Sequence, residues 1–461
     1  MKRSTMKNSL IFLSLSLLLL TFVYTSLSTT VTHLEAAQNI SQISKPLATE
    51  SFNLTEEMEV GLEIEARSTG ASWAREGAEA AALLISVDGV YQQDLLLWAG
   101  DELFPYRVML GHLNRGKHTV SVTLNESRSA AEARRAEVKS LRPLPFAPAR
   151  GAGSVDEDQL ALAHSPFLYA RANTIDRFTD IPLLMYYEIL REAGSDLIVR
   201  YTAIFTNEDG GTQTAALMAR WGRATDIEWV YQIRLRHRKI IEETYQGVEH
   251  KTKNFTGQRT AGSHPLLAVA SDNNNFSDLA CSSVRFAPLP VRARLETATR
   301  ESVMDMYPQT YRVMTEELLR EKRISETPTD INTIADPREY LYIEATSEQE
   351  GATLAFDVKV AGQPQTFASD MGEPRLRIDR SGYFRTAARL PRNVSPAAVE
   401  TITARCAASS KPAGERRCKH LKVVRALMLD QNYVPRTLPL QTQPESSLAA
   451  GETKVFRLAR P

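Results

Sequence analysis

The chain has 461 residues, of which 43% are apolar and 24% are charged. These values are typical of soluble globular proteins, and they exclude a disordered chain, a collagen-like chain and a polytopic membrane protein. Lysine and arginine together number 55, and so do aspartate and glutamate. The balanced charge creates no overall field that attracts nucleic acid, so we expect no nucleic-acid partner. The length suggests about three domains.

The chain begins with basic residues, which are followed by an apolar run over residues 10–23. A basic start, a short apolar stretch and small residues after it are typical of a secretory signal peptide. We expect residues 1–28 to be removed, and a second candidate cleavage position follows Ala37. The alternative is an uncleaved anchor, although the run is shorter than the ~20 residues that span a bilayer. The sequence thus predicts a secreted, periplasmic or cell-envelope protein with no membrane span after cleavage.

The three cysteines are too few for a disulfide scaffold. Cys406 and Cys418 bracket a polar loop, and strands entering and leaving that loop would bring their thiols together. In an exported protein we predict a disulfide between them, with free thiols as the alternative. Cys281 lies between an alanine and a serine, and we expect it to stay free as a small buried apolar residue.

Apolar and polar residues alternate in several separate parts of the chain. The alternation runs through residues 60–66 near the N-terminus and 353–360 near the C-terminus, and a period of two indicates half-buried strands. Residues 309–323 show the 3.6-residue period of a helix instead, and we expect them to form the longest one. The sequence predicts a mainly β fold, in which two antiparallel β-sandwich-like domains flank a β-rich central domain and one α-helix connects them.

Changes in composition along the chain suggest its division into domains. The expected parts are a signal peptide over residues 1–28, a flexible leader over 29–49, an N-terminal sandwich-like domain over 50–148, a central domain over 154–300, a helix and connector over 301–334, and a C-terminal sandwich-like domain over 335–461. The N-terminal domain contains DGVYQQDLLLWAG, then a strand, then LNRGKHTVSVTL. In this arrangement it resembles secreted β-sandwich modules of the carbohydrate-binding kind.

Polar and aromatic residues are concentrated together in residues 164–278. Aromatic rings can stack on the flat face of a sugar while carboxylates and amides bond its hydroxyl groups. The aromatic members are Tyr186, Tyr187, Trp221, Trp229 and Tyr231. The candidate ligand-binding residues are Asp226, Glu228, Arg223, Glu188, Tyr186, Asn207, Glu208, Asp209, His264, Asp272 and Asn275. The alternative is that residues 207–211 are an ordinary hairpin turn and that the two central carboxylates form a solvated strand face.

Strand alternation predicts the direction of Asp226 and Glu228. The apolar residues expected on the buried face are Ile227, Trp229, Tyr231 and Ile233. The two carboxylates should therefore point away from the core, towards the loop with residues 207–209 or the loop with residues 272–275. Arg223 should pair with one carboxylate and keep it ionised, whereas the second, crowded beside the first, should have a raised pKa.

Carboxylate and amide oxygens in an exported protein also suit calcium. No contiguous calcium-loop motif is present, so a possible calcium site would be assembled from separate loops, and no other cofactor is evident.

Two carboxylates at alternate positions of one strand stand ~6–7 Å apart, which overlaps the separation used in glycoside hydrolysis. Neighbours on one strand flank a glycosidic bond poorly, however, and the sequence contains no nucleophile elbow and no HExxH zinc motif. We therefore favour a glycan- or ligand-binding or structural envelope protein over an enzyme, with a secreted polysaccharide hydrolase or lyase as the alternative.

Three pieces of the central segment, YTAIFTNEDGG, TDIEWVYQI and SHPLLAVA, resemble the central part of the vacuolar-sorting family of domains of unknown function. That family has a G-D-W-E strand motif and a later segment of small residues and histidine. The matching residues here are Asp226, Glu228 and Trp229, followed by His264, and the order D-I-E-W departs from the family's pattern. The resemblance implies a β-rich fold and no established catalytic residues. The whole chain also resembles exported proteins of environmental bacteria.

Overall fold

The computed structural model describes residues 45–147, 156–172, 174, 177–191, 196–208, 210–236, 239–410 and 414–459. Strands account for 49% of the structure and helices for 12%, so the chain has the mainly β fold that the sequence predicts. The expected signal peptide and most of the expected leader lie outside the described residues. The boundaries between the expected domains stay predictions. The elements described below belong to one compact unit that begins at Leu47.

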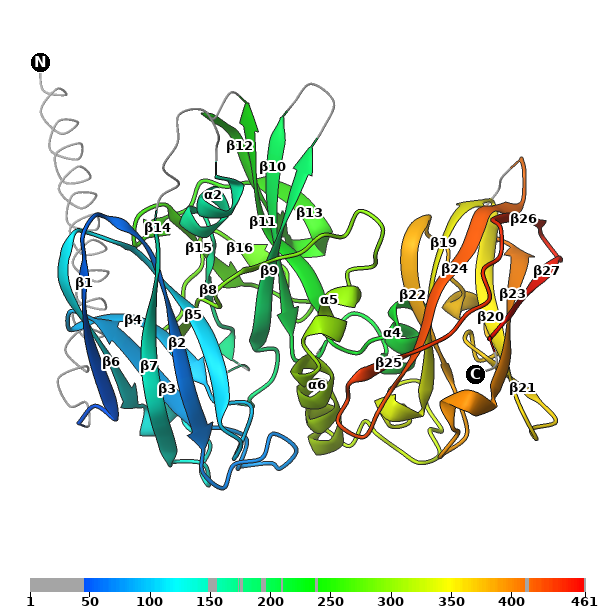
Figure 1. The fold of residues 1–461 in the computed structure, drawn as a ribbon, viewed down its shortest axis with the longest axis horizontal. Coiled ribbons are helices and arrows are strands. Elements are labelled where there is room, and N and C mark those ends of the chain that lie inside the picture. The colour runs from blue at the N-terminus through cyan, green and yellow to red at the C-terminus, as the bar shows by residue number, and fades with distance from the viewer. Residues whose placement is uncertain are drawn as a thin grey trace, which may run out of the picture. The chain divides into compact units, whose positions relative to one another are not determined.

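The first part of the chain, drawn in blue and cyan in Figure 1, forms two antiparallel sheets. Their strand orders are β1-β6-β3-β4 and β5-β2-β7. The alternation in β2 builds the core, because Leu62, Ile64 and Ala66 are fully buried while Glu63 and Glu65 are less so. The strand bounds are β1 Ala48–Leu54, β2 Met58–Ser68, β3 Ala82–Val87, β4 Val90–Leu96, β5 Phe104–Leu113, β6 Gly116–Leu124 and β7 Ala136–Phe146, with the short helix η2 at Glu126–Arg128.

The central part, drawn in green, is a sheet with the main strand order β17-β8-β15-β16-β12-β11-β10-β9-β18. Its middle is a run of long antiparallel neighbours, β9 to β12. The strand bounds are β8 Phe167–Tyr169, β9 Pro182–Arg191, β10 Leu197–Phe205, β11 Ile227–Arg236, β12 Lys239–Gly247, β13 Lys251–Asn254, β14 Arg259–Thr260, β15 His264–Val269, β16 Phe276–Ser277, β17 Arg285–Phe286 and β18 Val291–Arg292. Three short helices, α2 (Glu157–Ala163), α4 (Thr214–Trp221) and η3 (Val248–His250), are not predicted from the sequence, because each is too short to show a helical period.

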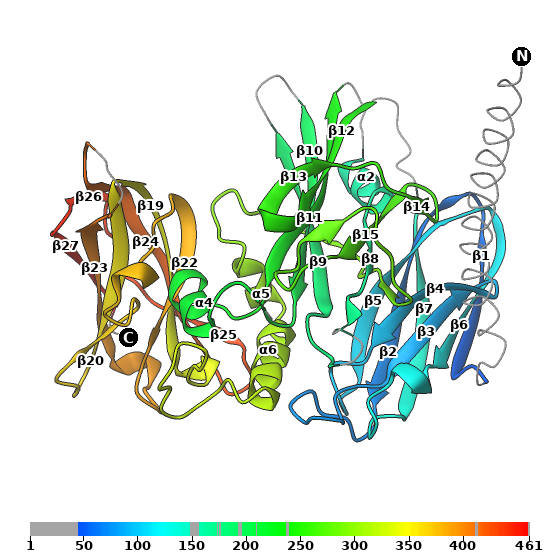
Figure 2. The ribbon, with the colours of Figure 1, turned by 180° about the vertical axis from the view of Figure 1, so that it is seen from behind.

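Two consecutive helices follow the central sheet, α5 (Ser302–Met306) and α6 (Gln309–Arg320). Among the described helices α6 is the longest, as the sequence predicts, and Figure 2 shows it between the central and C-terminal strands. Tyr311 of α6 packs edge-on against Tyr342 of β19, with 6.1 Å between ring centroids. Glu317 is buried on the other side, where it accepts a hydrogen bond from Nε1 of Trp73 at 2.8 Å. None of the described helices is long and apolar enough to cross a membrane.

The last part of the chain, drawn from yellow to red, forms two further antiparallel sheets. One has the order β22-β19-β24-β25 with β26 beside β24, and the other has the order β21-β20-β23-β27. One hydrophobic cluster joins the two sheets and includes Phe356 and Phe384. The strand bounds are β19 Tyr340–Glu350, β20 Ala352–Val360, β21 Thr366–Ala368, β22 Gly382–Arg389, β23 Val399–Ala408, β24 Arg417–Leu429, β25 Pro435–Leu438, β26 Ser446–Ala449 and β27 Thr453–Arg457, with short helices η4 Pro337–Glu339, η5 Pro374–Leu376 and η6 Pro396–Ala398.

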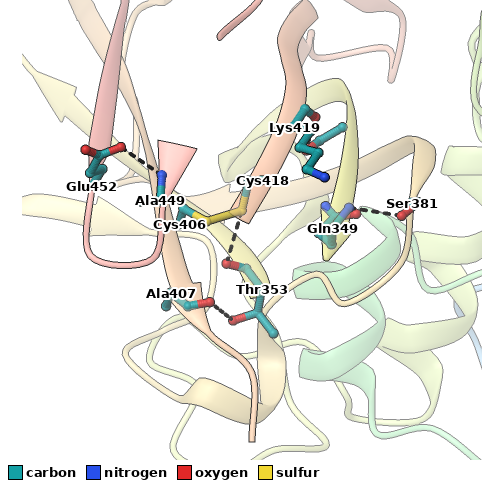
Figure 3. The surroundings of a disulfide bond; sticks show 10 residues. Gln349, Thr353, Ser381, Cys406, Ala407, Cys418, Lys419, Ala449 and Glu452 are labelled. Atoms are coloured by element: carbon teal, nitrogen blue, oxygen red, sulfur yellow. Dashed lines mark hydrogen bonds between the residues drawn. A yellow bond between two sulfur atoms is a disulfide. The ribbon is translucent and has the colours of Figure 1, made fainter. Parts of the chain in front are cut away.

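A disulfide links the two C-terminal sheets (Figure 3). It joins Cys406 of β23 to Cys418 of β24, whose Cα atoms are 6.1 Å apart, and it is the pairing expected from the sequence. Cys281 is free, as expected, but it is exposed rather than buried. The reason is that it lies on a surface loop between β16 and β17, where no neighbouring strand covers it.

Candidate functional site

A β-bulge in β11 determines which side chains the candidate segment presents. In the pairing of β11 with β10 the register shifts, so that Val230 becomes an extra residue. An extra residue of this kind breaks the regular alternation along a strand. The structure therefore corrects the expectation of one buried apolar face: Ile227 packs in one hydrophobic cluster, Tyr231 and Ile233 pack in another, and Trp229 is only half-buried.

Asp226 immediately precedes β11 and is only 1% exposed. Its Oδ2 accepts a hydrogen bond from Nδ2 of Asn274 at 3.0 Å, and the same nitrogen donates to Oδ1 of Asp180, also at 3.0 Å. One amide group therefore bridges two buried carboxylates. Asp226 faces the 272–275 loop, which is one of the two predicted directions. The expectation that it points away from the core is wrong, because that loop covers it.

Glu228 lies two residues further along and nearer to solvent. It accepts a hydrogen bond from Nε2 of Gln246 on the neighbouring strand β12, and its Oε2 lies 3.7 Å from Nδ1 of His250. The other ring nitrogen of His250, Nε2, lies 2.8 Å from Nδ2 of Asn273. His250 thus connects Glu228 to the 272–275 loop.

The loop that follows β10 lies against the 272–275 loop. The N–H of Gly210 donates to the carbonyl oxygen of Asp272 at 3.1 Å. Gly211 has a φ of 91°, and a Cβ atom at this position would lie 2.9 Å from Oδ1 of Asn273. Glycine is therefore needed here both for the left-handed backbone and for the close approach of the two loops.

Glu208, in the loop after β10, adds a fourth carboxylate to Asp180, Asp226 and Glu228. It is buried, and its Oε1 accepts a hydrogen bond from the N–H of Thr212 at 2.7 Å. Asp209, which the sequence also predicts as a site residue, lies outside the described residues. We refer to Asp180, Glu208, Asp226, Glu228, His250 and Asn274 together as the central polar cluster.

The environment shifts the pKa values of this cluster in opposite directions. Burial, followed by the negative charges of Glu228 and Glu208, raises the pKa of Asp226 well above its usual range. Burial also raises the pKa of Glu208. Burial acts in the same sense on Glu228, but His250 and the hydrogen bond from Gln246 outweigh it and lower the pKa of Glu228. The pKa values of the two neighbouring carboxyl groups Asp226 and Glu228 are therefore moved apart.

Several residues of the cluster adopt a left-handed backbone. The φ angles are 52° for Asp180, 62° for the adjoining Glu249, 56° for His250 and 44° for Asn274. This conformation costs roughly 1–2 kcal/mol for a residue with a Cβ atom, and such positions collect at functional sites. Oδ1 of Asn274 is also buried without a hydrogen-bond partner among the described residues. At Asn274, a strained backbone and a side-chain oxygen without a hydrogen-bond partner among the described residues therefore occur together.

Two further predicted residues lie at the edge of the cluster. Asp272 forms an ion pair with Arg171, and Arg171 pairs with Asp180 as well. Nδ2 of Asn275 lies 3.4 Å from Nδ1 of His250. The structure therefore brings both residues of this loop close to Asp226 and Glu228.

Two other predicted residues are held by different partners. Nε of Arg223 pairs with Oε1 of Glu301 at 3.2 Å. The expectation that Arg223 pairs with Asp226 or Glu228 is therefore wrong. Asn207 points towards α6, where its Nδ2 donates to Oε2 of Glu321 at 3.3 Å. Both side chains help to fix the position of the segments after the central sheet.

Glu188 and His264 also lie apart from the cluster. Glu188 is on β9, opposite Arg200 of β10, and burial raises the pKa of Glu188. His264 is fully buried, with Nε2 at 2.9 Å from Oε2 of Glu59 and Nδ1 at 2.8 Å from the carbonyl oxygen of Ser165. His264 therefore links the central sheet to β2.

The predicted aromatic platform does not form. Tyr186, Tyr187 and Tyr231 are buried in the core. Trp221 is half-buried, and the guanidinium groups of Arg220 and Arg380 lie over its ring at 5.0 and 5.1 Å from the centroid. These aromatic residues fill the interior because they pack into two hydrophobic clusters, Tyr186 in one and Tyr187 and Tyr231 in the other.

Sequence reasoning did not select Asp180, Gln246, His250, Asn273 or Asn274 as site residues. The run of three asparagines was a usable signal, because asparagine tolerates the left-handed backbone that Asn274 adopts. His250 gave no such signal. Its position depends on the turn after β12, and no spacing in the sequence relates that turn to Glu228.

Within the described ranges, no three side chains of histidine, cysteine, aspartate or glutamate are grouped so that they could hold a metal ion. No protein-family model matches the chain, and no curated protein matches it either. The resemblance of the central segment to the vacuolar-sorting family stays a prediction. A functional argument therefore rests on the geometry of the central polar cluster.

Proposed function

We propose that the chain is an exported binding protein whose central polar cluster holds a hydroxyl-rich ligand such as a glycan. The observation that carries this proposal is that the 272–275 loop contacts Asp226 directly and Glu228 through His250, while Gly210 of the loop after β10 packs against it. Export is supported by the signal-like start of the sequence. It is also supported by the disulfide, because such bonds persist in oxidising compartments.

The outer rim of the cluster supplies the contacts. The exposed fraction of the side chain is 53% for His250 and 80% for Asp272, against 12% for Glu228. Imidazole, carboxylate and amide groups therefore meet solvent together, and they match the donors and acceptors of sugar hydroxyl groups. Because the aromatic residues of the segment are largely buried, recognition rests on hydrogen bonds rather than on ring stacking.

A secreted polysaccharide hydrolase or lyase is the second candidate. The observation that favours it is the opposite shift in the pKa values of Asp226 and Glu228, because acid–base catalysis uses titratable groups whose pKa values have been separated. Against it stands the burial of Asp226, since a catalytic acid must come within ~2.6–3.2 Å of the reacting atom. Binding is therefore the stronger of the two proposals.

A glycan array combined with a polysaccharide-degradation screen on the mature protein tests both candidates. Binding without turnover supports a binding protein, and turnover supports the enzyme. The variants Glu228→Gln and His250→Ala should each weaken binding at least tenfold. His420→Ala is the matched control, because it removes another exposed His–Glu pair on the C-terminal sheets, with 3.3 Å between Nδ1 and Oε2 of Glu445. Full binding by both cluster variants contradicts the proposal.

Calcium stays a prediction from the sequence, since oxygen ligands suit it, although the described residues contain no group of three acidic, histidine or cysteine side chains that could hold a metal ion. Calorimetric titration of CaCl2 into EDTA-treated protein tests this possibility. The double variant Asp226→Asn/Glu228→Gln should stay cooperatively folded and should lose any saturable heat. A double variant that binds calcium normally, or that fails to fold, places the site elsewhere.

A further inference from the structure

A cavity of about 260 Å³ lies where the N-terminal sheets meet the central part of the chain. Strands β4 and β5 form one side of it. Residues 181–184 at the start of β9 and residues 286–291 around β17 and β18 form the other side. Tyr307 and Gln309, at the start of α6, complete the wall. The cavity is separate from the central polar cluster, since none of the cluster residues lines it.

Backbone hydrogen bonds hold two of these walls together. Residues 286–289 run alongside β5, where the N–H of Met109 donates to the carbonyl oxygen of Ala287 at 2.8 Å. The N–H of Leu289 donates to the carbonyl oxygen of Arg107 at 3.1 Å. The cavity is therefore framed by paired backbone, as in ligand sites that are formed before the ligand arrives.

The floor of the cavity is aromatic and apolar. Trp98, Phe104 and Tyr106 pack ring against ring, with centroids 4.6, 5.0 and 5.1 Å apart. Trp98 and Tyr106 are buried, whereas Tyr307 and Gln309 are half-buried. The most exposed residues of the wall are Pro105 and Arg107 of β5, so a ligand would enter along that strand.

The charged residues of the wall already have partners. Nε of Arg107 donates to Oε2 of Glu63 at 2.8 Å. Asp94 accepts a hydrogen bond from the hydroxyl group of Tyr91, and burial raises the pKa of Asp94, which favours its neutral form. Its Oδ1 has no hydrogen-bond partner among the described residues but is closed off from solvent, so the polar groups that a ligand can reach are the hydroxyl group of Tyr307 and the amide group of Gln309. The wall thus suits a neutral, mainly apolar molecule with few polar groups.

We propose that this cavity binds a small neutral aromatic compound of about two fused rings, at a second site that does not depend on the central polar cluster. An apolar cavity of ~150 Å³ accommodates a benzene-sized molecule. The larger volume here, about 260 Å³, leaves room for a second ring. The aromatic floor provides the edge-on and offset contacts that such rings prefer.

Calorimetric titration with three compounds of the same shape tests the ligand class. The probes are 2-naphthol, which is neutral at pH 7, the anion 2-naphthoate and the cation 2-naphthylmethylammonium. We expect 2-naphthol to bind with one-to-one stoichiometry and at least tenfold more tightly than either charged compound. Equal or tighter binding of the cation would assign the site to amines and would overturn the proposal, as would equal binding of the anion or the absence of saturable binding.

A pair of matched variants tests the location. Leu289→Trp places a large ring inside the cavity, and Leu279→Trp makes the same change on a loop position that is 86% exposed. The first variant should weaken 2-naphthol binding at least tenfold, and the second should leave it unchanged. If Leu289→Trp melts early by circular dichroism, Leu183→Trp fills the cavity from the start of β9, a different segment of the same side. Unchanged binding in a folded cavity-filling variant overturns the proposal.

Discussion

The C-terminal sheets and the central sheet bury their side chains for different purposes. The C-terminal core is apolar, with Phe356, Phe384 and Ile402 packed together and a disulfide between the sheets. In the central part, Asp226 and Asn274 are as deeply buried as those apolar residues. Burial of apolar side chains stabilises the fold, whereas burial of carboxyl groups costs stability and fixes their protonation. The C-terminal part also buries charged groups, but it pairs them, as Arg385 pairs with Glu344 at 2.6 Å, whereas the central cluster brings carboxyl groups together.

The largest effect on stability should come from the apolar core. Phe356→Ala removes a fully buried ring and leaves a cavity, which should lower the free energy of unfolding by about 3–5 kcal/mol. Ligand binding by the central polar cluster should not change, because Phe356 contributes nothing to it. Urea denaturation followed by circular dichroism measures the loss. A loss below ~1 kcal/mol would show that the C-terminal core does not stabilise the fold in this way.

The next effect concerns Glu317 of α6, which, like Asp226, is a buried carboxyl group. Burial raises the pKa of Glu317 from 4.5 to about 7. The pKa of Glu317 is higher in the folded state than in the unfolded state. The wild type should therefore lose about 3 kcal/mol of stability as the pH rises from 4.5 to about 7. Glu317→Gln does not titrate and should keep that stability. Denaturation at pH 5 and pH 8 measures the difference between the two proteins.

The Glu317→Gln variant is its own control for shape, because the side chain keeps its size and can still form hydrogen bonds. Gln at this position can still accept from Trp73 and interact with the hydroxyl group of Thr179, although it removes the charge that lies 3.9 Å from Nη2 of Arg320. A stability difference between Glu317→Gln and the wild type that is the same at both pH values would contradict the raised pKa.

Removal of the disulfide should have a somewhat smaller effect. The bond closes a loop between residues 12 positions apart, and its loss through Cys406→Ala/Cys418→Ala should cost roughly 2–3 kcal/mol. Reduction of the wild type should lower the urea midpoint by a similar amount. Both treatments should leave the central polar cluster intact. A simultaneous loss of ligand binding would show that the two regions are not independent.

The smallest expected effects are changes in stability of opposite sign when Glu228 and Asp226 are neutralised. The lowered pKa of Glu228 contributes stability that is present above its unfolded pKa and lost as the pH falls through the folded value. Glu228→Gln should therefore destabilise the protein at pH 7, and it should do so progressively less as the pH falls below 4.5, for example towards pH 3. The raised pKa of Asp226 has the opposite consequence, so Asp226→Asn should leave stability unchanged or increase it at pH 8. Thermal melting of both variants at these pH values provides the measurement.

The regular parts of the fold could be predicted from the sequence because local patterns determine them. β2 alternates between a covered face and an open face, and the 3.6-residue period of α6 reflects the sheets on its two sides. In the central sheet, alternation does not predict which side chains are buried. Its strands contribute side chains to two hydrophobic clusters, and the bulge at Val230 changes the direction of every side chain beyond it.

The candidate site could be predicted only in part. The turn residues around 207–211 and 272–275 showed where two loops would lie, and Asp226 indeed faces the second of them. His250 could not be found, because its approach to Glu228 depends on the left-handed turn after β12. Long-range contacts of this kind leave no periodic signal in a single sequence.

The central claim is that the polar cluster moves the pKa values of two neighbouring carboxyl groups, Asp226 and Glu228, apart. Carboxyl ¹³C NMR titration of selectively labelled protein, with signals assigned through Asp226→Asn and Glu228→Gln, measures both pKa values directly. The pKa of Asp226 should lie well above 3.8 and that of Glu228 should lie below 4.5, the ordinary values of the two groups. Two carboxyl groups that titrate together near their ordinary values would contradict the claim.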